Sequence, residues 1–110
     1  MNKVIVVFGG DSDEKEISAL SATSILKNIS NDFSARKINL NDLDLNLLDD
    51  EIIFIAVHGK GGEDGHLQKA LETKNIRFTG SGSDATKKCW DKHLSKNILM
   101  KNGINTPFSY

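Results

Sequence analysis

A glycine turn followed by acidic residues is the first stretch of this chain that could bind a ligand. It runs from Gly9 to Ser18 and reads GGDSDEKEIS. The backbone N–H groups of such a turn and the positive end of the following helix dipole favour an anionic group. Carboxylates in the same stretch favour a cationic group, and they belong to Asp11, Asp13, Glu14 and Glu16. A zwitterion satisfies both requirements, although acidic residues in a first helical turn can also simply complement the dipole.

A second polar loop carries a histidine that could order or polarise a substrate. It runs from His58 to Gly65 and reads HGKGGEDG. His58 could be combined with Glu63, Asp64 and His66 in a metal site, but two histidines on a loop are weak support and we assign no metal ligand. A neutral histidine that is hydrogen-bonded within its loop is the simpler interpretation.

A late glycine pattern raises the alternative of a dinucleotide site. Gly80 to Ala85 fits G-x-G-x-x-A and follows a predicted strand. In a dinucleotide fold the pattern usually follows the first strand, and an acidic residue lies about 20 residues further on. Here that distance falls near Met100 and Lys101, which are not acidic. The alternative predicts NAD contacts at Gly80 and Gly82.

The apolar pattern indicates which elements position these loops. Unbroken apolar runs at Val4–Phe8 and Ile52–Val57 predict strands that are buried on both faces, and each run ends at a glycine loop. Asp13 and Glu16 fit a loose capping box for the intervening helix, with Ser12 as a competing cap. One apolar face of that helix is formed by Ala22, Ile25, Leu26 and Ile29.

Weaker patterns complete the expected order of elements. They are a less buried strand at Phe33–Leu40, a loop at Asn39–Asp50, a short helix with Leu67, Ala70 and Leu71, a brief strand at Ile76–Thr79, and a last helix from an Asp91 cap to Gly103. Alternating strands and helices predict an α/β fold with an open, mainly parallel sheet and helices on both faces. Ligands of such sheets bind at the carboxyl ends of the strands, so the glycine turns should form one rim there.

Length and composition limit the classes of partner. The chain has 110 residues, which is typical of one domain. Its formal net charge of -1 gives no electrostatic reason to expect nucleic acid or an anionic membrane as a partner. The single cysteine, Cys89, fits a reducing compartment, and beside Trp90 it predicts a core or interface position rather than a nucleophile. With no apolar run of the length of a signal or a membrane span, we expect a cytoplasmic protein.

Taken together, these stretches resemble the N-terminal domain of the D-alanine–D-alanine ligases, ATP-dependent enzymes that make the dipeptide for peptidoglycan and hence for the cell wall. The resemblance runs from Lys3 to nearly Tyr110 and rests on GGDSDEKEIS, HGKGGEDGHLQKALE, and FTGSG followed by DKHLSK. The second stretch resembles the family's highly specific signature H-G-x-x-G-E-D-G. The chain departs from the usual family residues at Lys69, Arg77 and Trp90. The fold that the resemblance implies is the Rossmann-like domain that precedes an ATP-grasp.

The resemblance also implies a reaction and residue roles. ATP would phosphorylate the carboxylate of a first D-alanine, Mg²⁺ would bridge the phosphates, and the amine of a second D-alanine would attack the acyl phosphate. By position, Glu14 would be the catalytic and substrate-binding residue that holds the ammonium group of the first D-alanine, and His58 would lie in the substrate-side loop. Glu63 and Asp64 would shape that loop rather than react. Lys92 would contact an ATP phosphate; its simpler interpretation is a solvated lysine in a first helical turn.

The length of the chain sets it apart from complete members of that family, which continue into central and C-terminal ATP-grasp domains. Those domains supply most ATP contacts and the carboxylates for Mg²⁺. We therefore expect residues 1–110 to be the N-terminal domain of such a ligase and to make no dipeptide alone. Family members form dimers partly through this domain, so the complete enzyme is expected to be a homodimer. A stand-alone α/β module that binds a small zwitterion is the second hypothesis.

Overall fold

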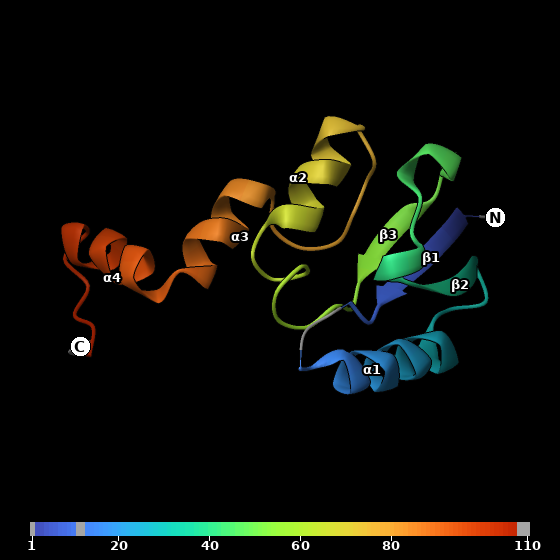
Figure 1. Cartoon of the computed structure of the whole chain (residues 1–110), viewed down its shortest axis with the longest axis horizontal. Coiled ribbons are helices and arrows are strands. Elements are labelled where there is room, and N and C mark those ends of the chain that lie inside the picture. The colour runs from blue at the N-terminus through green and yellow to red at the C-terminus, as the bar shows by residue number, and fades with distance from the viewer. Residues whose placement is uncertain (1, 11–12, 108–110) are drawn as a thin grey trace.

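The computed structural model is an open, three-stranded parallel sheet with helices on both faces (Figure 1). It describes residues 2–10 and 13–107. The strand order is β2-β1-β3, with β1 at Asn2–Phe8, β2 at Phe33–Asn39 and β3 at Ile52–Ile55. Residues 4–7 of β1 are all buried, because this central strand has neighbours on both edges and helices on both faces. The predicted fold class is confirmed.

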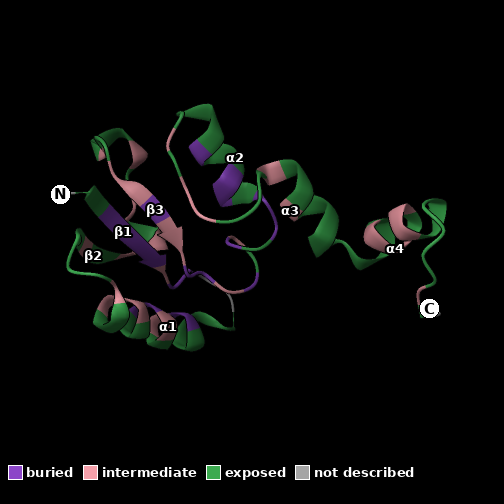
Figure 2. Ribbon diagram, turned by 180° about the vertical axis from the view of Figure 1, so that it is seen from behind, coloured by how far each residue is buried: buried purple, intermediate pink, exposed green. Residues whose placement is uncertain are grey.

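Two helices divide the core between the faces of the sheet (Figure 2). Val4 and Val6 point to one face and pack with Ala22 of helix α1 (Lys15–Asn28). Ile5 and Val7, which alternate with them, point to the other face. There they pack with Leu67 and Leu71 of helix α2 (His66–Thr73). The apolar helix face predicted from Ala22, Ile25, Leu26 and Ile29 is the face that meets the sheet.

The last two helices extend away from the sheet and give the molecule its long axis of 46 Å (Figure 1). They are α3 (Ser83–Trp90) and α4 (Lys92–Lys101), and neither has a buried residue. The predicted Asp91 cap is confirmed, since its side chain accepts a 3.0 Å hydrogen bond from the backbone N–H of Leu94. Gly103, at a φ of 77°, follows the end of α4 as expected. Among the described residues, no helix has both the length and the apolar character needed to cross a lipid bilayer.

The predicted start of α1 is wrong. The helix begins at Lys15 with Glu14 as its N-cap and with no hydrogen bond from the cap side chain, so Asp13 does not form the expected capping box. The competing cap, Ser12, lies outside the described residues. A tertiary contact replaces the local cap, because the buried side chain of Ser18 anchors the first turns of α1 to the sheet.

The sheet is also smaller than the apolar runs predicted. The brief strand expected at Ile76–Thr79 is reduced to one bridge, between Ile53 and Phe78. β3 ends at Ile55, although the next two residues of the run are buried. The loop predicted between the second and third strands contains two short 3₁₀ helices, η1 (Leu40–Asp42) and η2 (Leu45–Leu47).

Candidate functional site

The glycine loops after β1 and β3 lie together at the carboxyl edge of the sheet. A Cβ atom placed on Gly10 would lie 3.4 Å from Leu40 Cδ2 and 3.6 Å from Val57 Cγ1. A Cβ atom on Gly61, in the second loop, would meet the same Leu40 atom at 3.4 Å. Both loops therefore lie against the same Leu40 side chain, and the prediction that they share one edge of the sheet is confirmed.

The third glycine turn borders the second loop. Ser81, from the turn at 80–82, lines a shallow hollow of about 350 Å³ with Gly62 and Glu63 of the second loop. Cys89 and Trp90 of α3 line the same hollow, and both are exposed. Of the two positions predicted for Cys89, the core is wrong, because α3 has no buried residue, and the interface stays a prediction.

Ser18 ties α1 to the segments that follow β1 and β3. Its side chain is fully buried, accepts a 2.8 Å hydrogen bond from the Gly9 N–H and donates a 2.6 Å hydrogen bond to the Ala56 carbonyl oxygen. Its own N–H donates to the carbonyl oxygen of Glu14 at 3.0 Å. The position of Glu14 at the edge is thus coupled to the glycine turn and to β3.

Sequence reasoning assigned no role to Ser18. The signal was present, because Ser18 precedes Ala22 by four residues and therefore lies on the buried face of α1. A hydroxyl group on an otherwise apolar face needs hydrogen-bond partners, which the loop carbonyl and amide groups supply.

His58 joins the second loop to α1. Its side chain is 36% exposed, and its Nε2 lies 3.0 Å from Ser21 Oγ on α1. Its Nδ1 lies 3.6 Å from Glu63 Oε1 in the same loop. Sequence reasoning foresaw a histidine held within its loop, but it missed the partner on the helix, 37 residues earlier in the chain.

Asp64 and Gln68 shape the second loop. Asp64 accepts hydrogen bonds of 3.1 Å from the backbone N–H groups of Gly61 and His66, one at each carboxylate oxygen. Gln68, a residue that sequence reasoning missed, donates a 2.8 Å hydrogen bond to the Gly62 carbonyl oxygen. The expected loop-shaping role of Asp64 is confirmed.

The metal alternative has little geometric support at this loop. The side chain of His66 is 81% exposed, and its Nε2 lies 4.0 Å from Asp64 Oδ2. In the part of the chain that the structure describes, no three His, Cys, Asp or Glu side chains are grouped so that they could hold a metal ion.

The structure brings Glu14 and His58 to the same edge, but it does not bring Lys92 there. Glu14 is exposed at the start of α1, the helix whose Ser21 contacts His58. Lys92 is the exposed first residue of α4, at the end of the molecule remote from the sheet (Figure 1). A contact between Lys92 and ATP stays a prediction.

The late glycine pattern is arranged unlike a pyrophosphate site. The backbone N–H of Ser83, at the start of α3, donates a 3.0 Å hydrogen bond to Glu72 Oε1. The side chain and backbone of Ser83 lower the pKa of the Glu72 carboxyl, so it stays ionised. Its negative charge would repel a phosphate at this helix start. The pattern here fastens α3 to α2.

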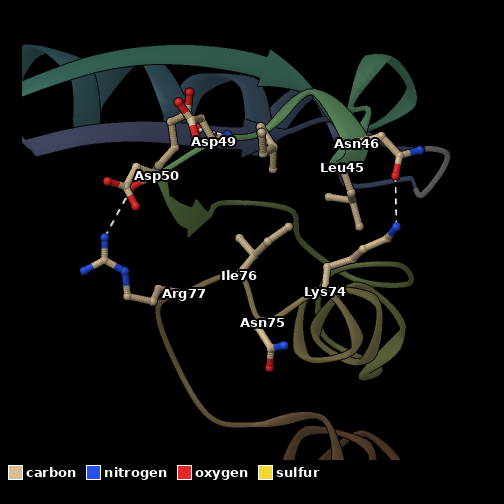
Figure 3. A pocket seen from close by; sticks show the side chains of 10 residues that line it. Leu45, Asn46, Asp49, Asp50, Lys74, Asn75, Ile76 and Arg77 are labelled. Atoms are coloured by element: carbon tan, nitrogen blue, oxygen red, sulfur yellow. Dashed lines mark hydrogen bonds between the residues drawn. The ribbon is translucent and has the colours of Figure 1, made fainter.

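A separate hollow of about 290 Å³ lies at the amino end of β3, away from the glycine loops (Figure 3). Lys74 Nζ crosses it to Asn46 Oδ1 at 2.9 Å, and an Arg77 guanidinium nitrogen donates to the Asp50 carbonyl oxygen at 3.2 Å. These bonds hold the loop before β3 against the end of α2. We assign this hollow a structural role.

Comparison with known protein sequences finds D-alanine–D-alanine ligases among the relatives of this chain. The chain matches no protein-family model. It is 38% identical over 109 residues to a D-alanine–D-alanine ligase of Azoarcus sp. (strain BH72), a match that covers 96% of this chain and 36% of that protein. A D-alanine–D-alanine ligase of Bacillus anthracis is 37% identical over 109 residues, with the same coverage.

Solved structures agree with the sequence matches. A crystal structure of the Bacillus anthracis D-alanine–D-alanine ligase complexed with ATP superposes with a TM-score of 0.90 at 35% identity, over 98% of this chain and 38% of that one. The chain spans about a third of the length of the curated relatives that it matches. The resemblance predicted from the motifs is confirmed: over nearly all of its length, this chain is similar in sequence and fold to part of a D-alanine–D-alanine ligase.

Proposed function

We propose that this chain is the N-terminal, amino-acid-binding domain of an ATP-dependent D-alanine–D-alanine ligase that serves peptidoglycan synthesis in the cytoplasm. The observation that carries the proposal is the placement of Glu14 and His58 at one edge of the sheet, linked through α1. The similarity of almost the whole chain to such ligases supports the choice of substrate.

The edge suits a zwitterionic amino acid. The exposed carboxylate of Glu14 can accept hydrogen bonds from the ammonium group. Glu14 gives α1 no side-chain cap, and the positive end of the helix dipole lies beside the glycine turn after β1. That end of α1 favours the carboxylate of the substrate. His58 is held between the second loop and α1, which supports a role in orienting the same substrate.

In the proposed reaction, a carboxylate oxygen of the first D-alanine attacks the γ-phosphorus of ATP. The bond to the β-phosphate oxygen breaks, and the products are an acyl phosphate and ADP. The amine of the second D-alanine then attacks the carbonyl carbon, the carbon–oxygen bond to phosphate breaks, and the amine loses a proton. The share of this chain is to bind and orient the first D-alanine. The described residues offer no cluster for Mg²⁺, so we assign no step to that ion within this chain.

Two further parts of the proposal concern contacts beyond the edge. Lys92 is proposed to bind a phosphate of ATP whose remaining contacts come from the rest of the ligase, in keeping with its exposed position on α4. The complete enzyme is proposed to be a homodimer, which sedimentation velocity would measure directly.

NMR titration of the ¹⁵N-labelled chain tests the proposal. D-Alanine should shift the amide signals of Glu14 and His58 more than L-alanine does, and with weak affinity because a partial site supplies few contacts. Micromolar affinity would support the stand-alone module instead. Shifts at Gly80 and Gly82 on addition of NAD would support the dinucleotide alternative. The absence of any response to D-alanine, or ADP formation by the chain alone, would contradict the proposal.

A matched pair of variants assigns the response to one carboxylate. Glu14→Gln should weaken D-alanine binding about tenfold or more, because a charge-assisted hydrogen bond to the ammonium group is lost. Glu16→Gln removes the same charge from another exposed residue in the first turn of α1 and should leave binding nearly unchanged. Equal losses in both variants would show that only the general negative charge matters.

A further inference from the structure

His58 lies between two side chains of different chemistry. On one side, Nδ1 lies 3.6 Å from a carboxylate oxygen of Glu63, which belongs to the same loop. On the other side, Nε2 lies 3.0 Å from the hydroxyl oxygen of Ser21 on α1. The first distance is too long for a good hydrogen bond but short for a charge interaction, whereas the second is an ordinary hydrogen-bond distance.

This arrangement discriminates between the two neutral forms of the ring. A carboxylate attracts an N–H group and repels a nitrogen lone pair, so Glu63 favours the form with the proton on Nδ1. Nε2 is then the acceptor, and the Ser21 hydroxyl, which can donate or accept, donates to it. In the opposite form, a lone pair on Nδ1 would face the Glu63 carboxylate.

We propose that Glu63 and Ser21 are positioning residues that fix the proton of the neutral His58 ring on Nδ1 and hold the ring against α1. The contact with Ser21 couples the position of the His58 ring to that of Glu14, because Ser21 and Glu14 both belong to α1 or its cap. Ser18 fixes that placement through its hydrogen bonds to Gly9 and Ala56. The ring is therefore oriented before a ligand arrives, which reduces the ordering cost of binding. Only the identity of the ligand, D-alanine, rests on the proposed function.

The ¹⁵N chemical shifts of the ring nitrogens report the proton position directly. They are recorded on the 110-residue chain at a pH where the ring is neutral. In the unmodified chain, Nδ1 should give the shift of a protonated nitrogen and Nε2 that of an unprotonated one. In Glu63→Gln, which keeps the volume and removes the charge, the population should move toward the Nε2–H form. A proton on Nε2 in the unmodified chain, or unchanged populations in Glu63→Gln, would overturn the proposal.

Glu51→Gln is the matched control, since it removes the charge of a half-buried glutamate just before the amino end of β3, the end opposite His58. It should leave the His58 ring shifts unchanged. A change in Glu51→Gln as large as that in Glu63→Gln would show that net charge, and not contact, sets the ring form. That result would also overturn the proposal.

Ser21 is tested through the ligand. Ser21→Ala should keep the proton on Nδ1, because Glu63 remains, but should weaken D-alanine binding about fivefold as the ring loses its second contact. Ser21→Thr restores the hydroxyl and should recover most of the affinity. Unchanged affinity in Ser21→Ala would overturn the role of Ser21. If D-alanine does not bind the unmodified chain, the proposed function fails, whereas the ring shifts still decide the role of Glu63.

Discussion

The Ser18 hydroxyl donates a 2.6 Å hydrogen bond to the carbonyl oxygen of Ala56, a residue 38 positions further along the chain. Ser18 Oγ in turn accepts a 2.8 Å hydrogen bond from the backbone N–H of Gly9. One buried side chain therefore joins the helix that begins at Glu14, the turn that follows β1 and the segment that follows β3. The candidate site depends on all three.

Replacement of Ser18 by alanine should destabilise the fold. The change leaves the Gly9 N–H and the Ala56 carbonyl without their partner in a buried place. Each such group costs about 1–3 kcal/mol, so the free energy of unfolding should fall by roughly 2–6 kcal/mol. Urea unfolding followed by circular dichroism measures the loss. Ser24→Ala, on the exposed side of α1, is the control and should change the free energy of unfolding by less than about 0.5 kcal/mol. Similar losses in both variants would contradict the bridging role of Ser18.

Gly62 should tolerate no side chain in the present loop conformation. A Cβ atom there would lie 2.4 Å from the Val57 carbonyl oxygen and 2.5 Å from Val57 Cβ, so the loop would have to move. Gly62→Ala should lower the free energy of unfolding by about 1–3 kcal/mol, the usual cost of overpacking, and should shift the amide signal of His58. Urea unfolding and a two-dimensional NMR spectrum give the two readings.

Gly82→Ala is the matched control for that loop variant. A Cβ atom on Gly82 would lie an ordinary 3.7 Å from Glu72 Oε2, the nearest atom apart from its own chain neighbours, and the Gly82 φ of -66° suits alanine. Gly82→Ala should lower the free energy of unfolding by less than about 1 kcal/mol, since the variant loses only the preference for glycine over alanine at a helix N-cap. A greater loss in Gly82→Ala than in Gly62→Ala would show that the close approach to Val57 does not limit the loop.

The contact between Glu72 and Ser83 should make stability depend on pH in the acidic range. Hydrogen bonds from the side chain and the backbone of Ser83 lower the pKa of the Glu72 carboxyl below its ordinary value of 4.5. A carboxyl whose pKa is lower in the folded state stabilises the protein fully above its unfolded-state pKa. That stabilisation is lost as the pH falls through the folded-state value. The unmodified chain should therefore lose more stability on acidification than Glu72→Gln, in which this group cannot titrate.

Two measurements check the pH dependence. Carboxyl ¹³C NMR should give a pKa for Glu72 below the ordinary value, and Ser83→Ala should raise it part of the way, because the backbone N–H of residue 83 still donates. Urea midpoints measured against pH should converge for the unmodified chain and Glu72→Gln at low pH. Parallel pH profiles for the two proteins would count against a stabilising contact.

Local chemistry was enough to predict the three strands of the sheet, the glycine turns and the end of the last helix, but not that the fourth expected strand is a single bridge. The apolar run at Val4–Phe8 could be placed because a central parallel strand must be apolar on both faces. The Asp91 cap and the Gly103 stop could be placed because each depends on backbone groups only a few residues away. The glycine loops could be placed at one edge because the carboxyl ends of parallel strands all lie at the same edge of the sheet.

The tertiary structure decided how those loops are held. The start of α1 was mispredicted because the anchor at Ser18 joins residues that lie far apart in the chain, and no local cap reveals it. Likewise, the contact of His58 with Ser21 exists only once α1 packs beside the end of β3. A hydrogen bond forms wherever packing brings a donor to an acceptor, and sequence separation does not limit it. The sequence by itself thus predicted that the glycine loops share one edge and which residues there could bind a zwitterion, and only the folded chain decided which contacts hold Glu14 and His58 at that edge.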